Sequence, residues 1–229
     1  MPTISFCPTS LLLNSLPYMD DQIEEYILSH IDEEPEILRL LNRDTQVNFL
    51  NGRMVSGHLQ GRLLVMLSRM IKPERVLEIG TFTGYSAICF AEGTDENAQI
   101  HTVELNDELE ETILNWFRLA GYSEKIQLHI GDALEIIPEL EGLFDMVFID
   151  LEKRDYIACH EAVFPKVKPG GFILVDNTLW YGKILGEIDP GDAQSLAISK
   201  YNDYIANDSR VEKVILPLRD GLTIIRKKY

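Results

Sequence analysis

The chain has 229 residues, of which 45% are hydrophobic and 25% are charged, and its formal net charge is −16 at pH 7. This length and apolar content suffice for one large hydrophobic core and argue against two separate enzyme-sized domains. The acidic balance repels a phosphate backbone, and no basic patch in the sequence offsets it, so the composition argues against a nucleic-acid partner.

The sequence shows no sign of membrane insertion or secretion. No apolar run reaches the length of a membrane span, and the first residues lack the basic segment and small-residue cleavage site of a secretory leader. The cysteines, Cys7, Cys89 and Cys159, are too few and too far apart for a disulfide framework or a zinc site. We therefore expect a soluble cytoplasmic protein with reduced thiols and no membrane partner.

The N-terminal part of the chain has a helical pattern. Apolar residues recur at helical spacing in two runs, Ile23, Ile27 and Ile31, and then Leu59, Leu63, Met66, Leu67 and Met70. Methionine and leucine at such spacing usually face a core, so no chemistry is assigned to them. We expect a helical extension over residues 1–53 and a single large domain over residues 54–229.

From residue 75 onward, short β-branched runs alternate with segments of helical length. The expected strands are residues 76–79, 99–103, 126–130, 145–149 and 171–175. The expected helices are residues 85–92, 107–120, 134–140 and 154–167. This alternation predicts a parallel sheet with helices on both faces. Residues 185–192 are expected to form a loop, and 211–216 and 222–225 flank a turn signal at Arg219-Asp220-Gly221, which predicts a closing hairpin.

The first two strands end in residues that suit a nucleotide. In open α/β sheets, ligands bind at the carboxyl ends of the strands. Gly80 and Gly84 lie in the turn after the first strand and permit close approach to a ligand, although they could equally serve only the connection. Glu104 ends the second strand 24 residues after Gly80, where nucleotide-binding folds hold ribose hydroxyls. Together they indicate an adenosine-containing ligand, whereas His101 and His129 are expected to be hydrogen-bonded within the fold.

The next three strands end in acids and an amide. Asp132, after the third strand, could cap a helix or accept from an adenine amino group. Asp150 follows the fourth strand and Asp176 and Asn177 follow the fifth, so we expect these three to converge. Such an all-oxygen set suits Mg²⁺, Mn²⁺ or Ca²⁺. The alternative is that Asp150 and Asp176 are helix caps and turn formers.

A set of motifs, taken in order, resembles a known family. The motifs are Met54 to Gly61 (MVSGHLQG), Leu77 to Ser86 (LEIGTFTGYS), Gly131-Asp132-Ala133, Phe148-Ile149-Asp150 with Lys153, and Gly170-Gly171 followed by Asp176-Asn177. Their order and spacing resemble the metal-dependent, S-adenosylmethionine-using O-methyltransferases of the catechol and caffeoyl-CoA type. The resemblance implies a doubly wound, Rossmann-like sheet of seven strands with the last strand antiparallel. It also implies a homodimer.

The resemblance assigns a role to each matching residue. It implies that S-adenosylmethionine is bound by Ser56, Glu78, Gly80, Ser86, Glu104, Asp132, Ala133, Asp150 and Glu152, with Glu104 on the ribose and Asp132 and Ala133 on the adenine. It implies that the divalent cation, Mg²⁺ by preference, is held by Asp150, Asp176 and Asn177. Lys153 matches the general base, and Trp180 and Tyr181 would form an aromatic wall for a small planar acceptor.

The chain departs from its relatives at three positions. Many relatives have Asp-Ala-Asp-Lys where this chain has Asp150-Leu151-Glu152-Lys153, and Tyr181 replaces a smaller polar residue. The expected function is divalent-metal-dependent O-methylation of a small catechol-like acceptor. The alternatives are a tRNA hydroxyuridine O-methyltransferase of the same fold and a non-catalytic S-adenosylmethionine-binding protein.

Overall fold

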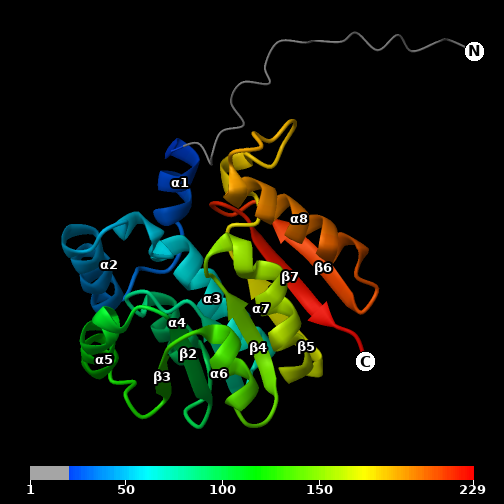
Figure 1. Cartoon of the computed structure of the whole chain (residues 1–229). Helices are drawn as coiled ribbons and strands as arrows, with labels where there is room; N and C mark the ends of the chain where they lie inside the picture. The colour runs from blue at the N-terminus through cyan, green and yellow to red at the C-terminus, as the bar shows by residue number, and fades with distance from the viewer. Residues whose placement is uncertain (1–20) are drawn as a thin grey trace, which may run out of the picture.

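The computed structural model describes residues 21–229, so Cys7 and the first twenty residues of the expected extension lie outside the described residues. One seven-stranded sheet has the order β3-β2-β1-β4-β5-β7-β6 (Figure 1). The strands are β1 Arg75–Ile79, β2 Gln99–Glu104, β3 Ile126–Ile130, β4 Phe144–Ile149, β5 Val167–Val175, β6 Val211–Leu216 and β7 Leu222–Lys227. Strands β1 to β5 pair in parallel, while β7 is antiparallel to both β5 and β6. The predicted sheet and its closing hairpin are therefore confirmed.

Helices connect the strands. The α-helices are α1 Asp21–Leu28, α2 Glu36–Asn48, α3 Gly57–Ile71, α4 Tyr85–Gly93, α5 Glu110–Leu119, α6 Ala133–Glu139, α7 Tyr156–Val163 and α8 Ala193–Asn207. Short 3₁₀ turns are η1 Gly52–Met54, η2 Asp107–Leu109, η3 Lys153–Asp155, η4 Phe164–Lys166 and η5 Trp180–Gly182. Two expected helices are thus shorter than predicted, since 3₁₀ turns take up their ends. Within the described residues, no helix combines the length and apolar character needed to cross a membrane.

Helix α8 was missed by the sequence analysis. The carboxylate of Asp192 accepts a hydrogen bond from the backbone N–H of Ser195 at 3.1 Å and so caps the helix. Aspartate is a preferred N-cap residue, and this helix-start signal is independent of the pattern of apolar residues. The expected loop over residues 185–192 therefore leads into a helix.

The strands bury alternate side chains on the two faces of the sheet. One face carries Val76 and Met146, which pack with side chains from α2, α3, α4 and α5. The other carries Leu77 and Val147, which pack with side chains from α6, α7 and α8. Figure 1 shows the second group of helices on the near side of the sheet. Successive side chains of a strand point to opposite faces of the sheet. Because helices cover both faces, each strand buries side chains on both.

The core-facing side of α3 differs from the prediction. Met66 and Met70 are 47% and 73% exposed, so these two members of the expected apolar face point away from the core, whereas Leu63 and Leu67 are half-buried and pack against it. Leu64 faces the core instead, on a side that also contains Gly61. A Cβ atom added at Gly61 would lie 2.8 Å from a ring carbon of Tyr85, so α3 approaches α4 too closely for a larger side chain there. Close helix packing thus overrode the spacing of the large apolar residues.

The three isoleucines at four-residue spacing near the N-terminus do not all lie on one helix. Helix α1 ends at Leu28, so Ile31 lies beyond it, and Ile23 is exposed. A helix of eight residues gains little from intrinsic propensity and depends on tertiary contacts. The four-residue spacing therefore overestimated the length of this helix.

The histidines expected to be hydrogen-bonded within the fold contact each other. The rings of His101 and His129 stack, and Nδ1 of His101 lies 3.1 Å from Nε2 of His129. Burial, and then the charges of Arg75 and His129, lower the pKa of His101 to about 4, so the ring is neutral at pH 7. Cys89 and Cys159 are buried free thiols. Both observations agree with the sequence analysis.

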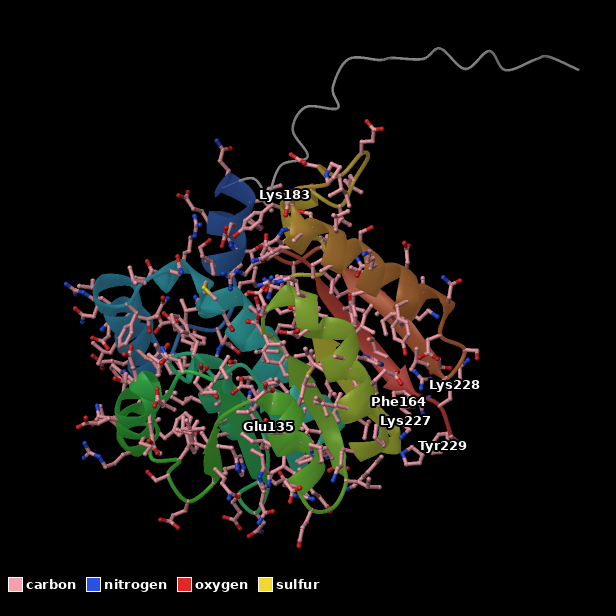
Figure 2. All side chains as sticks on the ribbon, viewed as in Figure 1. Glu135, Phe164, Lys183, Lys227, Lys228 and Tyr229 are labelled. Carbon is pink, nitrogen blue, oxygen red and sulfur yellow. The ribbon has the colours of Figure 1, made fainter. Side chains whose placement is uncertain are left out.

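The two ends of the sheet differ in what they carry. At one end Lys227, near the C-terminus, donates from Nζ to the backbone oxygens of Phe164 and Val167, each at 2.8 Å. Figure 2 shows Phe164 and Lys227 together at this end, and Lys183 at the opposite end, where η5 follows β5. The carboxyl ends of the parallel strands lie at the Lys183 end, so the site residues gather there.

Candidate active site

The ends of β1, β4 and β5 are held together by the backbone. The N–H of Asp150 donates to the oxygen of Ile79 at 2.8 Å, and the N–H of Asp176 donates to the oxygen of Ile149 at 3.0 Å. Gly80 has a φ of +99°, and a Cβ atom there would lie 1.8 Å from the backbone oxygen of Asp150. Only glycine therefore fits between these two strand ends, which places Gly80, Asp150 and Asp176 at one edge.

Lys153 lies at the centre of the polar groups on this edge. Its Nζ donates to Oδ1 of Asp150 at 2.9 Å, to Oδ1 of Asn177 at 2.6 Å and to the hydroxyl of Tyr156 at 2.8 Å. These contacts use all three hydrogens of an ammonium group, and the residue is only 8% exposed. Oxygens from two predicted metal ligands thus converge on one positive charge. Tyr156 was missed, although it lies three residues after Lys153, a spacing that brings side chains together on a helical turn.

The carboxylate of Asp176 is fixed at both oxygens. Oδ1 accepts from the N–H of Asn177 and Oδ2 accepts from Nε2 of Gln60, each at 2.8 Å. Burial, and then the charge of Asp150, raise the pKa of Asp176 to about 6. Neither aspartate accepts from a helix N-terminus in the part of the chain that the structure describes. A buried carboxylate whose pKa is raised by a neighbouring carboxylate, beside an amide oxygen, fits a hard divalent cation.

The acids at the ends of β1 and β2, Glu78 and Glu104, form a second group, here called the donor-side acids. Glu78 is fully buried, and its Oε2 accepts from the hydroxyl of Thr102 at 2.5 Å. Its other oxygen, Oε1, is buried with no hydrogen-bond partner among the described residues. Burial raises the pKa of Glu78 to about 8. A buried acceptor without a donor fits the cationic amine of S-adenosylmethionine, so the residues present fit this group.

The second donor-side acid closes the glycine turn. Oε2 of Glu104 accepts from the N–H of Phe82 at 2.8 Å, and Oε1 accepts from the N–H of Asn106 at 2.9 Å. Ser86 is buried in the first turn of α4, and Ser56 is buried at the start of α3. The structure therefore brings the turn after β1, the end of β2 and the start of α4 to one side of the sheet edge.

The residues expected at the adenine are at the surface. Oδ1 of Asp132 accepts from the N–H of Leu134 at 2.8 Å, so Asp132 caps α6, as one interpretation predicted. Ala133, the first residue of α6, is half-buried. Glu152 is exposed, and its carboxylate lies 3.5 Å from Nε of Arg154, outside the hydrogen bonds around the lysine. The contacts of these residues with a cofactor remain predictions.

The aromatic pair lies in an unusual backbone segment. Asn177, Trp180 and Tyr181 have positive φ angles of 56°, 45° and 54°, which cost energy for residues other than glycine and are concentrated at functional sites. The ring of Trp180 lies 5.7 Å from Nζ of Lys153, and its indole N–H is buried without a described partner. Tyr181 is 55% exposed, with its ring centre 6.0 Å from that of Trp180. Trp180 thus flanks the lysine, and Tyr181 lies farther out.

The comparisons with known proteins agree with this geometry. The O-methyltransferase family matches residues 28–228. Caffeoyl-CoA O-methyltransferases of Stellaria longipes and Eucalyptus gunnii are 31% and 33% identical to the chain, over 91% and 90% of its length and 91% and 88% of theirs. The SAH-bound methyltransferase PaMTH1 of Podospora anserina is 28% identical with a TM-score of 0.86, covering 95% of this chain and 100% of that one.

A second solved structure is similarly close. The O-methyltransferase TomG of Streptomyces achromogenes, which is involved in tomaymycin synthesis and was solved with SAM, is 27% identical with a TM-score of 0.82. That likeness covers 91% of this chain and 96% of TomG. The chain therefore belongs to the O-methyltransferase family, which confirms the prediction of an S-adenosylmethionine-dependent O-methyltransferase.

Proposed function

We propose that this enzyme methylates a hydroxyl of a small aromatic acceptor with two adjacent hydroxyls, with the help of a divalent cation. The observation that carries this proposal is the convergence of Asp150 and Asn177 on the buried Nζ of Lys153, beside Asp176 and the ring of Trp180. The caffeoyl-CoA O-methyltransferases among its relatives support an aromatic acceptor. Mg²⁺ is the first candidate, with Mn²⁺ and Ca²⁺ as alternatives.

Different residues of the protein have different roles in the proposed reaction. When bound, the cation lowers the pKa of an acceptor hydroxyl and S-adenosylmethionine supplies the electrophilic methyl group. Asp150, Asp176 and Asn177 would hold the cation. The charge of the cation would favour the neutral amine form of Lys153, and Nζ of that amine would take the proton from the acceptor.

Tyr156 holds the lysine and takes no proton itself. Its hydroxyl donates to the backbone oxygen of Asp176 at 3.0 Å and accepts from Lys153 at 2.8 Å. Complete burial, and then the charges of Asp150 and Asp176, raise the pKa of this phenol well above its ordinary value, so it stays protonated. Of the two side chains Tyr156 and Lys153, Lys153 is therefore the one proposed as the base.

A methyl-transfer screen tests the proposal directly. Catechols, caffeates, flavonoids and bulk tRNA would be assayed with S-adenosylmethionine, with Mg²⁺ and after chelation. We expect transfer to a catechol that requires the metal. Full activity of the chelated enzyme would refute the metal, and transfer to tRNA alone would favour the tRNA alternative. Binding of S-adenosylhomocysteine without transfer to any acceptor would favour a non-catalytic protein.

The homodimer, the cytoplasmic location and the domain division at residue 54 remain predictions.

For the dimer, the exposed Met66 and Met70 on α3 offer apolar area outside the core. Light scattering after gel filtration would distinguish a 26.1 kDa monomer from a species of twice that mass. A monomer at all concentrations would refute the dimer.

A further inference from the structure

A chain of hydrogen bonds connects the turn between β6 and β7 with the carboxylate of Asp176. Nη1 of Arg219 lies 3.3 Å from Oε1 of Gln60, and Nε2 of Gln60 donates to Oδ2 of Asp176 at 2.8 Å. Gln60 is 1% exposed and Asp176 is 4% exposed, so water does not compete for these contacts. Three segments that are distant in the sequence thus meet at one carboxylate.

Arg219 and Asp176, at the two ends of this series of hydrogen bonds, fix the orientation of the Gln60 amide between them. A guanidinium only donates hydrogen bonds and an ionised carboxylate only accepts them, whereas an amide does both. Gln60 can therefore satisfy both neighbours in one orientation, with its oxygen toward Arg219 and its NH₂ toward Asp176. Without Arg219, the NH₂ of Gln60 would still face Asp176, but its oxygen would lose the donor that holds the amide in place.

Arg219 is itself held firmly by the backbone. Its Nη1 donates to the backbone oxygen of Val55 at 2.9 Å and to that of Ser56, and its Nη2 donates to that of Arg53 at 3.3 Å. The backbone φ of Arg219 is 48°, in the left-handed region. A side chain with this many partners in a tight turn is a rigid anchor for Gln60.

The same turn also supports the aromatic segment. The backbone oxygen of Asp220 accepts from the N–H groups of Leu179 and Trp180, at 2.6 and 3.1 Å. The turn therefore contacts the start of α3 on one side of the site and the segment after β5 on the other. Its position between them makes it a common support for the metal ligand and the aromatic wall.

We propose that Gln60 is a positioning residue that fixes the carboxylate of Asp176 for cation binding, and that Arg219 acts through Gln60. This inference rests on the proposed role of Asp176 as a metal ligand. Hydrogen bonds to ligating carboxylates orient them, and loss of such a partner typically weakens metal binding by about 10- to 100-fold.

Binding of Mn²⁺ to the full chain, without acceptor, tests the inference. The signal of free Mn²⁺ in electron paramagnetic resonance gives the affinity, and calorimetry with S-adenosylhomocysteine gives the affinity of the donor side. We expect Gln60→Met, which keeps the length but removes the amide, to weaken Mn²⁺ binding by roughly 10-fold or more. Its affinity for S-adenosylhomocysteine should stay within about twofold of the wild type, because Gln60 contacts neither donor-side acid.

A double-mutant cycle tests the order of action. If Arg219 acts through Gln60, the variant with both Gln60→Met and Arg219→Met binds Mn²⁺ no more weakly than Gln60→Met alone. Additive losses would overturn the role of Arg219. The matched control is Gln46→Met on α2, whose amide donates to Asn42 at the surface and which should change neither affinity.

The outcomes separate this inference from the proposed function. Wild-type affinity in Gln60→Met, together with loss of Mn²⁺ binding in Asp176→Ala, would overturn the positioning role and leave the metal site standing. A wild-type chain that binds no Mn²⁺ would overturn both. If Gln60→Met does not fold, Gln60→Asn keeps the amide but is one methylene too short to reach both neighbours, and it should weaken Mn²⁺ binding likewise.

Discussion

The two groups of acids at the carboxyl ends of the strands are held in different ways. In the part of the chain that the structure describes, the donor-side acids, Glu78 and Glu104, accept from neutral groups, namely serine and threonine hydroxyls and backbone N–H groups. Asp150, on the metal side, is paired with the ammonium of Lys153 at 2.9 Å. A positive charge is therefore already present on one side of the site and absent from the other.

This difference indicates how each side responds to its ligand. Burial keeps Glu78 largely protonated near neutral pH, because its pKa is about 8, so a cationic ligand must draw a proton from it or meet a neutral acid. On the metal side, a cation must instead compete with Lys153 for Asp150 and Asn177. The variants below would test whether the two sides are as independent as their contacts suggest.

The largest effect is expected on the metal side. Lys153→Met removes the proposed base but keeps most of the side-chain volume, so kcat for a catechol should fall by roughly 10²- to 10⁴-fold. The affinity for S-adenosylhomocysteine should be nearly unchanged, because Lys153 contacts no donor-side acid. Steady-state kinetics with Mg²⁺ and calorimetry measure the two quantities.

A matched lysine controls for the loss of charge. Lys213 is exposed on β6, and among the described residues its Nζ donates only to the backbone oxygen of Asp208, at 3.2 Å. Lys213→Met should leave kcat unchanged. If Lys153→Met also turns over at the wild-type rate, Lys153 is not the base. The positive charge that distinguishes the metal side from the donor side would then have no role in turnover.

The second effect is expected on the donor side. Glu78→Gln keeps the shape and a partner for Thr102 but cannot become an anion, so the affinity for S-adenosylmethionine should fall by about tenfold or more. Mn²⁺ affinity should stay within about twofold. Glu139→Gln, an exposed change at the end of α6, is the control. Equal losses of donor and Mn²⁺ affinity would show that the two sides are coupled.

The third effect concerns the stability of the unliganded chain as a function of pH. Folded Glu78 keeps its proton up to about pH 8, whereas an unfolded glutamate loses it above its ordinary pKa of 4.5. Its contribution is therefore complete below pH 4.5 and is lost as the pH rises toward 8, with a slope of up to about 1.4 kcal/mol per pH unit.

Urea unfolding from about pH 5 to about pH 9 measures this slope. The wild type should lose stability relative to Glu78→Gln as the pH rises, and the difference should level off above about pH 8. The buried histidines titrate in both proteins, so the difference between the two curves cancels them. Parallel curves would mean that Glu78 is ionised in the folded chain.

The sequence predicted the parallel part of the molecule well. Strand patterns and the glycine turn identified β1 to β5, and the acids at their ends lie at one edge as expected. The reason is physical, because a parallel strand buried on both faces has a continuous apolar run and its end is marked by a polar residue. The packing that requires glycine at position 80, against the backbone of Asp150, was outside the reach of that pattern.

The supporting residues could not be predicted in the same way. Gln60, Tyr156 and Arg219 act through contacts between segments that are far apart or on helices, and no local pattern of residue types marks them. The exposed methionines of α3 show the converse error, since helical spacing identifies a stripe but does not say which side packs. Tertiary contacts determine both which supporting residues reach the site and which side of α3 packs against the core.

The smallest effect is expected for Glu152, which the resemblance places at the cofactor. Its side chain is 43% exposed and pairs with Arg154, which is 67% exposed, so solvent screens this interaction. Glu152→Gln should therefore change the affinity for S-adenosylmethionine by less than about fivefold and leave Mn²⁺ binding unaltered. Calorimetry on Glu152→Gln and Glu78→Gln under the same conditions gives the comparison. A loss as large as that of Glu78→Gln would mean that Glu152 leaves Arg154 when the cofactor binds, and that the donor side includes a residue beyond the ends of β1 and β2.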